Sequence, residues 1–416
     1  MLTRRGLAKG VALLGATPHT ALAQTPPDED SKRAPDEKPT GKFEVKPEAP
    51  SGEQKSEPPR PIVVLLSVDG GGIRGIAAAA MLREIDSEFQ ANGLRLIDCV
   101  DVFAGTSTGS IIAAGMAASK DRTLPYWEPQ AIIDIYRQQG PTIFGRRQSS
   151  SLLDLSRQRW DSRGLDQVLG TTFGGRRLRD LPGNLIVPYY NMEAPNGKSA
   201  VVALGGGLCD PAESRSQHYV RDVVSASSSA PTYFNPHRLN DTTLGVDGGV
   251  FANNPAMTAW VATQKWIQDQ ERYSQADIYV ISIGCGARAV QYPRNTTWGP
   301  LEWLQFWGQG GPPIIDVLMR GQSDLVDAQM AELMSPGKNY FRFQFDLPAP
   351  ATRRETPVGG LDDVSIGNLN ALEHLGVESC RTVQARTSIQ SMVGIIKRVR
   401  RQLEVGPERA IPNARV

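Results

Sequence analysis

The chain has 416 residues, of which 40% are hydrophobic, so it can bury the core of one large domain or of two ordinary ones. Its 45 basic and 44 acidic residues nearly cancel to a net charge of +1, which gives no electrostatic reason to expect nucleic-acid binding. The cysteines Cys99, Cys209, Cys285 and Cys380 form no C-x-x-C pair, which argues against a zinc site.

The N-terminus has the pattern of a bacterial export signal. Arg4 and Arg5 precede a short, mildly apolar run at 10–16, and Ala21-Leu22-Ala23 supplies the small-x-small pattern of a signal peptidase site. Paired arginines before a weak apolar stretch resemble the twin-arginine signal of bacteria, and this run is too short to span a bilayer. We therefore expect a signal peptide at 1–23 and an exported protein, periplasmic or secreted; the alternative is a basic tail that is never cleaved.

A tether is expected next, over residues 24–60. The segment is rich in Pro, Glu and Lys, and its only large apolar residues are Phe43 and Val45. Such a composition cannot offset the conformational entropy lost on ordering, so the sequence predicts a disordered tether here.

From Pro61 onward, strands alternate with helices. The run Ile62–Val68 is continuously apolar, as expected of a strand that is buried on both faces. Further strands are expected at 100–104, 185–188, 201–204, 244–246 and 278–283, and helices at 76–89, 110–119, 220–228, 256–268, 314–334 and 369–403. This alternation predicts an α/β fold with a mostly parallel central sheet covered by helices on both faces.

The glycine-rich turn after the first strand has two interpretations. Gly70–Gly75 satisfies G-x-G-x-x-G between a strand and a helix, which is typical of nucleotide-binding oxidoreductases. That fingerprint also expects an acid at the end of the next strand, but Asp98 and Asp101 lie at its beginning and middle. The other interpretation is a turn whose backbone amides face an oxyanion. Arg74 would add charge there or would pair with a surface carboxylate.

A serine follows the second predicted strand in the pattern G-x-S-x-G. The segment Gly105-Thr106-Ser107-Thr108-Gly109 joins an apolar strand to an Ala-rich helix, which is the context of a nucleophile elbow. The N-terminus of the following helix favours developing negative charge at Ser107. The alternative is an ordinary turn in which the serine only caps the helix.

A nucleophilic serine needs a base. The histidines outside the signal, His218, His237 and His374, lie in no recognisable catalytic loop, although a Ser-His-Asp esterase would need one of them. Asp247 follows a short strand and precedes Gly248-Gly249, so it is the better candidate. The alternative is that Asp247 merely closes an Asp-Gly turn.

Four blocks of the chain together resemble the patatin-like phospholipase family. They are Asp69–Gly75, Gly105–Gly109, Asp247–Gly249 and the segment Ser227–Phe234, which is similar to the Ser-Ala-Ala-Pro-Thr-Tyr-Phe segment of that family. Ser228 and Ser229 replace the alanines of that segment, and we expect this difference to affect packing only. The resemblance covers about residues 61–262, and four blocks in the right order are far more specific than any one of them.

The resemblance implies a three-layer α/β/α sandwich and a catalytic dyad without metal or cofactor. Ser107 would be the nucleophile and Asp247 its base, within apolar walls that raise the pKa of the carboxyl. The amides of Gly70, Gly71 and Gly72, helped by Arg74, would form the oxyanion hole. The substrate would be a phospholipid, a lysophospholipid or another acyl lipid, and the rival of the same fold is a non-catalytic lipid-binding protein. The acyl hydrolase domain is expected over 61–405, including a C-terminal helical part, with a tail at 406–416.

Two segments suggest transient contact with a membrane surface. Trp298, Trp303, Phe306 and Trp307 lie close together in the chain, and aromatic rings suit a lipid–water boundary. The stretch 393–401 is basic and amphipathic, which suits anionic lipid. The alternative for each segment is a helix that packs against the body of the protein.

Overall fold

The computed structural model describes residues 60–121, 128–145, 158–194, 197–210, 212–270, 275–288, 297–304, 312–348 and 358–405. The expected signal peptide, the expected tether up to residue 59 and the expected tail lie outside these residues. No helix within the described ranges is long and apolar enough to cross a membrane.

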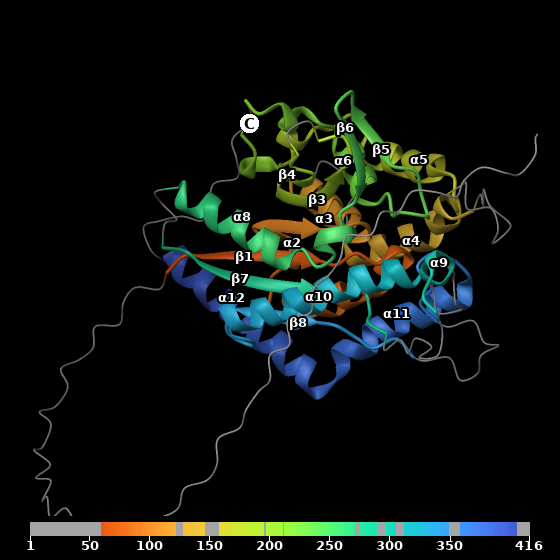
Figure 1. The fold of residues 1–416 in the computed structure, drawn as a ribbon. Coiled ribbons are helices and arrows are strands. Elements are labelled where there is room, and N and C mark those ends of the chain that lie inside the picture. Colours follow the sequence, from red (N-terminus) through yellow and green to blue (C-terminus); the bar gives the residue numbers. More distant parts are fainter. Residues whose placement is uncertain are drawn as a thin grey trace, which may run out of the picture. The chain divides into compact units, whose positions relative to one another are not determined.

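The strands form a single mixed sheet (Figure 1). In the described part of the chain it has eight strands, in the order β5-β6-β3-β2-β1-β7-β8, with β4 also pairing with β3. The pairs along the middle of the sheet, β3-β2, β2-β1, β1-β7 and β7-β8, are parallel, whereas β4, β6 and β5 add antiparallel pairs at one side. The strands are β1 Ile62–Val68, β2 Val102–Gly105, β3 Asn184–Asn191, β4 Ala200–Gly205, β5 His237–Asn240, β6 Thr243–Asp247, β7 Asp277–Ile283 and β8 Tyr340–Phe343.

Helices cover both faces of this sheet. They are α1 Gly75–Ala91, α2 Leu96–Cys99, α3 Thr108–Ala118, α4 Pro129–Ile143, α5 Ser162–Phe173, α6 Val220–Ser227, α7 Gly249–Ala252, α8 Ala256–Gln268, α9 Pro300–Leu304, α10 Pro313–Leu333, α11 Ile366–Arg381 and α12 Val383–Val405. Alternate residues of β1 belong to two separate cores: Val64 and Leu66 pack with α1, α3 and α11, whereas Val63 and Leu65 pack with α8 and with Met330 of α10. The expected three-layer α/β fold is confirmed.

The C-terminal helix was expected to be continuous over 369–403, and this expectation is wrong. The chain is extended at Thr382, between α11 and α12. The side chain of Thr382 accepts a hydrogen bond from the N–H of Ala385, so it caps the start of α12. The helices α4 and α5 and the short strands β5 and β8 were not predicted from the sequence.

Helix α12 packs on the body of the protein. Its apolar side chains, Ile389, Met392, Val393 and Ile396, are buried in the same core as α1. Arg400, one of its basic residues, donates to the carbonyl oxygen of Cys99. The alternative of a helix packed against the body of the protein is therefore confirmed for residues 389–396. Of the expected aromatic cluster, Trp298 and Trp303 pack with ring centroids 5.0 Å apart, whereas Phe306 and Trp307 lie outside the described residues.

The pairing of β3 brings the ends of β2 and β6 together. Strand β4 pairs with β3 from Leu185 to Tyr190, so it occupies one edge of β3. The other edge pairs first with β2, as far as Ile186, and then with β6, which runs in the opposite direction and ends opposite Tyr189. The carboxyl ends of β2 and β6 therefore face each other across about three residues of β3, or roughly 10 Å. Ser107 follows β2, and Asp247 ends β6.

Candidate active site

Ser107 occupies a strained turn between β2 and α3. Its backbone φ is 53°, in the left-handed region that residues with a side chain rarely adopt. The flanking glycines leave no room for a side chain: a Cβ at Gly105 would lie 2.0 Å from the carbonyl oxygen of Gly109, and one at Gly109 would lie 2.1 Å from that of Val68. The helix can therefore start immediately behind the strand, as in a nucleophile elbow.

Two buried hydroxyls hold this turn in place. The N–H of Ser107 donates to Oγ of Ser227 over 3.1 Å, and that hydroxyl donates to the carbonyl oxygen of Pro188 on β3 over 2.7 Å. Thr106 donates from its side chain to the carbonyl oxygen of Ala252 over 2.6 Å. The turn is thus tied to β3 and to the segment that follows Asp247. These roles of Ser227 and Thr106 could not be predicted from the sequence.

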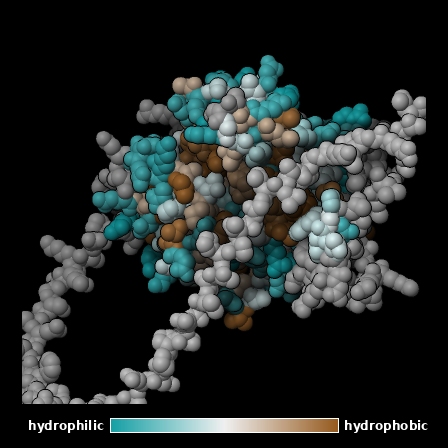
Figure 2. Space-filling view, viewed as in Figure 1, coloured by the Kyte–Doolittle hydropathy of each residue, from teal (hydrophilic) through white to brown (hydrophobic). Residues whose placement is uncertain are grey.

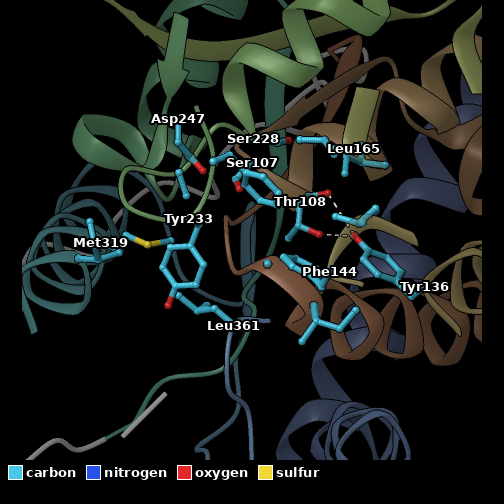
Figure 3. Close-up of a pocket in the computed structure, with 17 residues that line it drawn as sticks. Ser107, Thr108, Tyr136, Phe144, Leu165, Ser228, Tyr233, Asp247, Met319 and Leu361 are labelled. Carbon is cyan, nitrogen blue, oxygen red and sulfur yellow. Dashed lines mark hydrogen bonds between the residues drawn. The ribbon is translucent and has the colours of Figure 1, made fainter. Parts of the chain in front are cut away.

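Asp247 meets Ser107 inside the protein (Figure 3). Its side chain is buried, its Oδ1 accepts a 2.6 Å hydrogen bond from the N–H of Gly249, and it lines the same pocket as Ser107. Burial raises the pKa of Asp247 to about 7, although the hydrogen bond from Gly249 and the nearby hydroxyl of Ser107 oppose this shift. The carboxyl therefore takes up and releases a proton near neutral pH, as a general base must.

The glycine turn offers two backbone donors next to this pair. The N–H groups of Gly71 and Gly72 have no hydrogen-bond partner among the described residues, and Gly72 lines the same pocket as Ser107. Gly70 was expected to join them, but its N–H already donates to the carbonyl oxygen of Asn253 over 3.0 Å. The N–H of Thr108, the residue after Ser107, is a third donor that the described residues leave free. The sequence signal for Thr108 is its position in the elbow, because the residue after the nucleophile commonly donates to the oxyanion.

Arg74 lies beside the turn. Its Nε donates to the carbonyl oxygen of Gly359 over 2.6 Å, and the nearby charges include Arg288 and Asp316. Burial, followed by the proximity of Arg288, lowers the pKa of Arg74 to about 10, so it keeps its charge at neutral pH. This contact holds the segment around Gly359 against the glycine turn. A direct contribution of Arg74 to the oxyanion hole stays a prediction.

An apolar pocket opens at Ser107 and Asp247 (Figure 3). It encloses about 630 Å³ of space, part of which is open to solvent. Helices α3, α4 and α10 and the segment that follows α6 contribute most of its wall. The apolar and aromatic side chains that line it are Ile73, Ile111, Tyr136, Ile143, Phe144, Leu165, Ala230, Tyr233, Phe234, Ile315, Met319 and Leu361. The expectation of apolar walls around Asp247 is confirmed.

His237 contacts groups other than the Ser107–Asp247 pair. His237 lies on β5, where its Nδ1 is 3.0 Å from Oγ of Ser225 and its two ring nitrogens face Asp166 and Asp222. These carboxylates raise the pKa of His237 to about 9, against the effect of burial. Among the described residues, no hydrogen bond of Ser107 involves a histidine. The geometry therefore favours an aspartate rather than a histidine as the partner of Ser107.

Comparisons with known proteins find relatives of this chain. The family profile described as patatin-like phospholipase matches residues 66–260. "Patatin-like protein 1" of Oryza sativa subsp. indica is 30% identical, over 68% of this chain and 74% of that protein. "Patatin-like protein 2" of Arabidopsis thaliana is 28% identical, over 79% and 86%, and "Probable inactive patatin-3-Kuras 1" of Solanum tuberosum is 25% identical, over 76% and 85%.

Among solved structures, VipD from Legionella pneumophila matches at 14% identity with a TM-score of 0.32, over 75% of this chain and 67% of that chain. This likeness is too distant to carry an argument. The named plant relatives do not test the expectation of a bacterial, exported protein, which stays a prediction. The sequence relatives do establish the family: the chain belongs to the patatin-like phospholipases.

Proposed function

We propose that the protein is a lipid acyl hydrolase that cleaves ester bonds of phospholipids or lysophospholipids through Ser107 and Asp247. One observation carries this proposal: a buried carboxyl with a pKa near 7 and a serine held in a strained turn line the same apolar pocket. A nucleophile, a base and a binding surface for an acyl chain therefore come together in one place.

The reaction would proceed through an acyl-enzyme. Asp247 takes the proton from Ser107 as Oγ attacks the ester carbonyl carbon, and a tetrahedral intermediate forms. When the intermediate collapses, the bond to the alcohol oxygen breaks and the alcohol leaves with the proton from Asp247. Water, deprotonated by the same carboxylate, then attacks the acyl-enzyme. The fatty acid is released and the proton returns to Ser107.

The negative charge of the intermediate would rest on backbone amides. The free N–H groups of Gly71 and Gly72 approach from the glycine turn, and the N–H of Thr108 is presented by the start of α3. Donors of this kind typically contribute roughly 10²–10³ each in turnover because they are already oriented before the charge develops.

The pocket and its surroundings support a lipid substrate. Ile315 and Met319 of α10 line the pocket, whereas Val317 and Leu318 of the same helix are 42% and 41% exposed. Figure 2 shows hydrophobic surface near the middle of the face in view. An acyl chain that leaves a lipid surface would thus find apolar contacts on the outside of α10 as well as inside the pocket.

The oxidoreductase alternative finds less support. The N–H of Ile73 in the glycine turn donates to the carbonyl oxygen of Leu361 over 2.8 Å, and a Cβ at Gly72 would lie 2.2 Å from that oxygen. This part of the turn therefore packs against its own chain where the fingerprint would require a pyrophosphate. The non-catalytic alternative is the stronger rival, because one relative is named as a probable inactive patatin.

Labelling with a fluorophosphonate probe tests the proposed nucleophile. We expect the wild-type protein to react and peptide mapping to place the adduct on Ser107, while Ser107→Ala stays unlabelled because an alanine offers no nucleophile. His237→Ala is the matched control, since it removes a half-buried side chain without touching the pair, and it should label like the wild type. A folded wild type that neither labels nor releases fatty acid from phospholipid would support the non-catalytic rival instead.

A further inference from the structure

Ser228 is a buried serine that the proposed reaction does not use. It follows α6 and lines the pocket together with Ser107 and Asp247 (Figure 3). Its neighbours in the chain touch both members of the pair: Ser227 accepts from the N–H of Ser107, and the carbonyl oxygen of Ser229 accepts from the N–H of Asp247 over 3.1 Å. Because adjacent residues are only about 3.8 Å apart, Ser228 lies next to the reacting groups.

The hydroxyl of Ser228 differs from those of the serines around it. Ser225 donates to Asp166 over 2.7 Å, Ser227 donates to Pro188, and Ser229 donates to the carbonyl oxygen of Ser225 over 2.9 Å. Within the described chain, Oγ of Ser228 has no hydrogen-bond partner, although the residue is only 6% exposed. A buried hydroxyl without a partner costs free energy, and such groups are rare in folded proteins. Ser229 is bonded within the protein, so the expected role in packing is consistent with its contacts. The unpaired hydroxyl of Ser228 is not explained by packing.

We propose that the hydroxyl of Ser228 donates a hydrogen bond to an oxygen of the scissile ester. This inference rests on the proposed function and adds a third side chain to the reacting pair. An ester accepts through its carbonyl oxygen and its alkoxy oxygen, so any ester bound at Ser107 satisfies the donor that the free protein leaves unpaired. Among the described residues, no hydrogen bond holds the side chain of Ser228 in one rotamer, and rotation about χ1 moves the hydroxyl among three staggered positions.

The bond would act on the reaction in one of two ways. At the carbonyl oxygen, Ser228 would stabilise the same negative charge as the amides of Gly71, Gly72 and Thr108. At the alkoxy oxygen, it would stabilise the charge that develops on the leaving alcohol before the proton arrives from Asp247. Both are contacts with the reacting atoms, and they differ only in which ester oxygen accepts.

Two neighbouring variants test the inference. Ser228→Ala removes an unpaired hydroxyl, so we expect kcat/KM to fall roughly tenfold while Tm is unchanged or raised. Ser229→Ala removes a hydroxyl that is bonded within the protein, so we expect Tm to fall while kcat/KM changes little. Both serines are buried and differ by one position, which makes Ser229→Ala a matched control.

A thioester identifies the accepting oxygen. Sulfur is a weak acceptor, so a Ser228→Ala penalty that appears with an acyl ester but disappears with the matching thioester assigns the alkoxy oxygen. An equal penalty with both substrates assigns the carbonyl oxygen, and either result supports the inference. If wild-type protein is active, Ser107→Ala is inactive and Ser228→Ala matches the wild type within about twofold on both substrates, the inference fails while the proposed function stands. Equal losses of Tm and activity in both serine variants would also overturn it.

Discussion

At the scale of single residues, the ionised form of Asp247 that acts as a base lowers the stability of the folded protein. Asp247 is buried, and the main effect of burial is to raise its pKa from 3.8 to about 7. At pH values between 3.8 and about 7, Asp247 keeps its proton in the folded protein but loses it in the unfolded chain. The stability that protonated Asp247 contributes is therefore fully present below pH 3.8 and is lost as the pH rises through about 7.

Asp247→Asn separates stability from activity. We expect hydrolysis to fall by roughly 10²–10⁴ because the base is removed, and the variant to gain stability relative to wild type above pH 7 because an amide cannot ionise. The measurement is the midpoint of urea unfolding of both proteins at pH 5 and pH 8, together with esterase rates. The difference between the two proteins should grow from pH 5 to pH 8. A difference that does not change with pH would show that ionisation of Asp247 carries no cost.

The residues of the site were only partly predictable from the sequence. Ser107 and Asp247 could be named because a glycine pattern marks each of them, and the structure brings the two together. Gly70 could not be told apart from Gly71 and Gly72, because the use of its N–H by Asn253 depends on a contact with a distant part of the chain. The free hydroxyl of Ser228 was hidden for the same reason.

At the scale of elements, the glycine turn depends on one backbone conformation. Gly72 has φ +58°, and a Cβ there would lie 2.2 Å from the carbonyl oxygen of Leu361. Gly93, at the end of α1, has φ +74° with open space around it. The two glycines therefore share the left-handed conformation but differ in their contacts.

Replacing each glycine by alanine separates backbone strain from the shape of the turn. We expect Gly93→Ala to lose about 1 kcal/mol of stability with normal activity, since only the conformational preference is violated. Gly72→Ala must also displace Leu361 or the turn, so kcat should fall at least 10²-fold, as when an oxyanion donor is lost. Denaturant unfolding and esterase rates measure both effects. Equal kcat for the two variants would mean that the turn does not bind the oxyanion.

A fully buried strand was predicted well, whereas a partly exposed strand at the edge of the sheet was missed. Strand β1 was expected at Ile62–Val68 and is found there, because its run of buried residues leaves little choice. Strand β5, His237–Asn240, has two exposed residues among four, and its pairing with β6 includes a shift in register. Such a strand forms because it pairs with β6, so its own sequence does little to predict a strand.

At the scale of the whole molecule, the part of the chain that matches the family profile is not sufficient to build the fold. The match ends at residue 260, but β7 lies between β1 and β8 in the sheet. Arg342 on β8 donates to both carboxyl oxygens of Asp69, over 2.6 and 2.9 Å, immediately before the glycine turn. The later part of the chain therefore supports the site directly, and no block of the sequence resemblance reached that far.

Deletion of the N-terminal segment should leave the stability of the protein unchanged, whereas deletion of the C-terminal helix should lower it. Deletion of residues 1–57 removes only segments in which a signal and a tether are expected, so Tm and esterase activity of the remaining protein should not change. Deletion of residues 383–416 removes α12, whose Ile389, Met392, Val393 and Ile396 are buried in the core. Burial of each such side chain contributes about 1.5–3 kcal/mol, and the total approaches the roughly 5–15 kcal/mol by which domains are stable.

The shorter protein without α12 should therefore unfold or aggregate, and it should lose activity although Ser107 and Asp247 are intact. Ile396→Ala in the full-length chain is the milder test, because it leaves the helix in place and should cost about 2–5 kcal/mol. Thermal unfolding monitored by circular dichroism, together with esterase assays, measures both changes. A chain without α12 that keeps the wild-type Tm would contradict this prediction. It would show that the rest of the core is enough to hold the segments with Ser107 and Asp247 together.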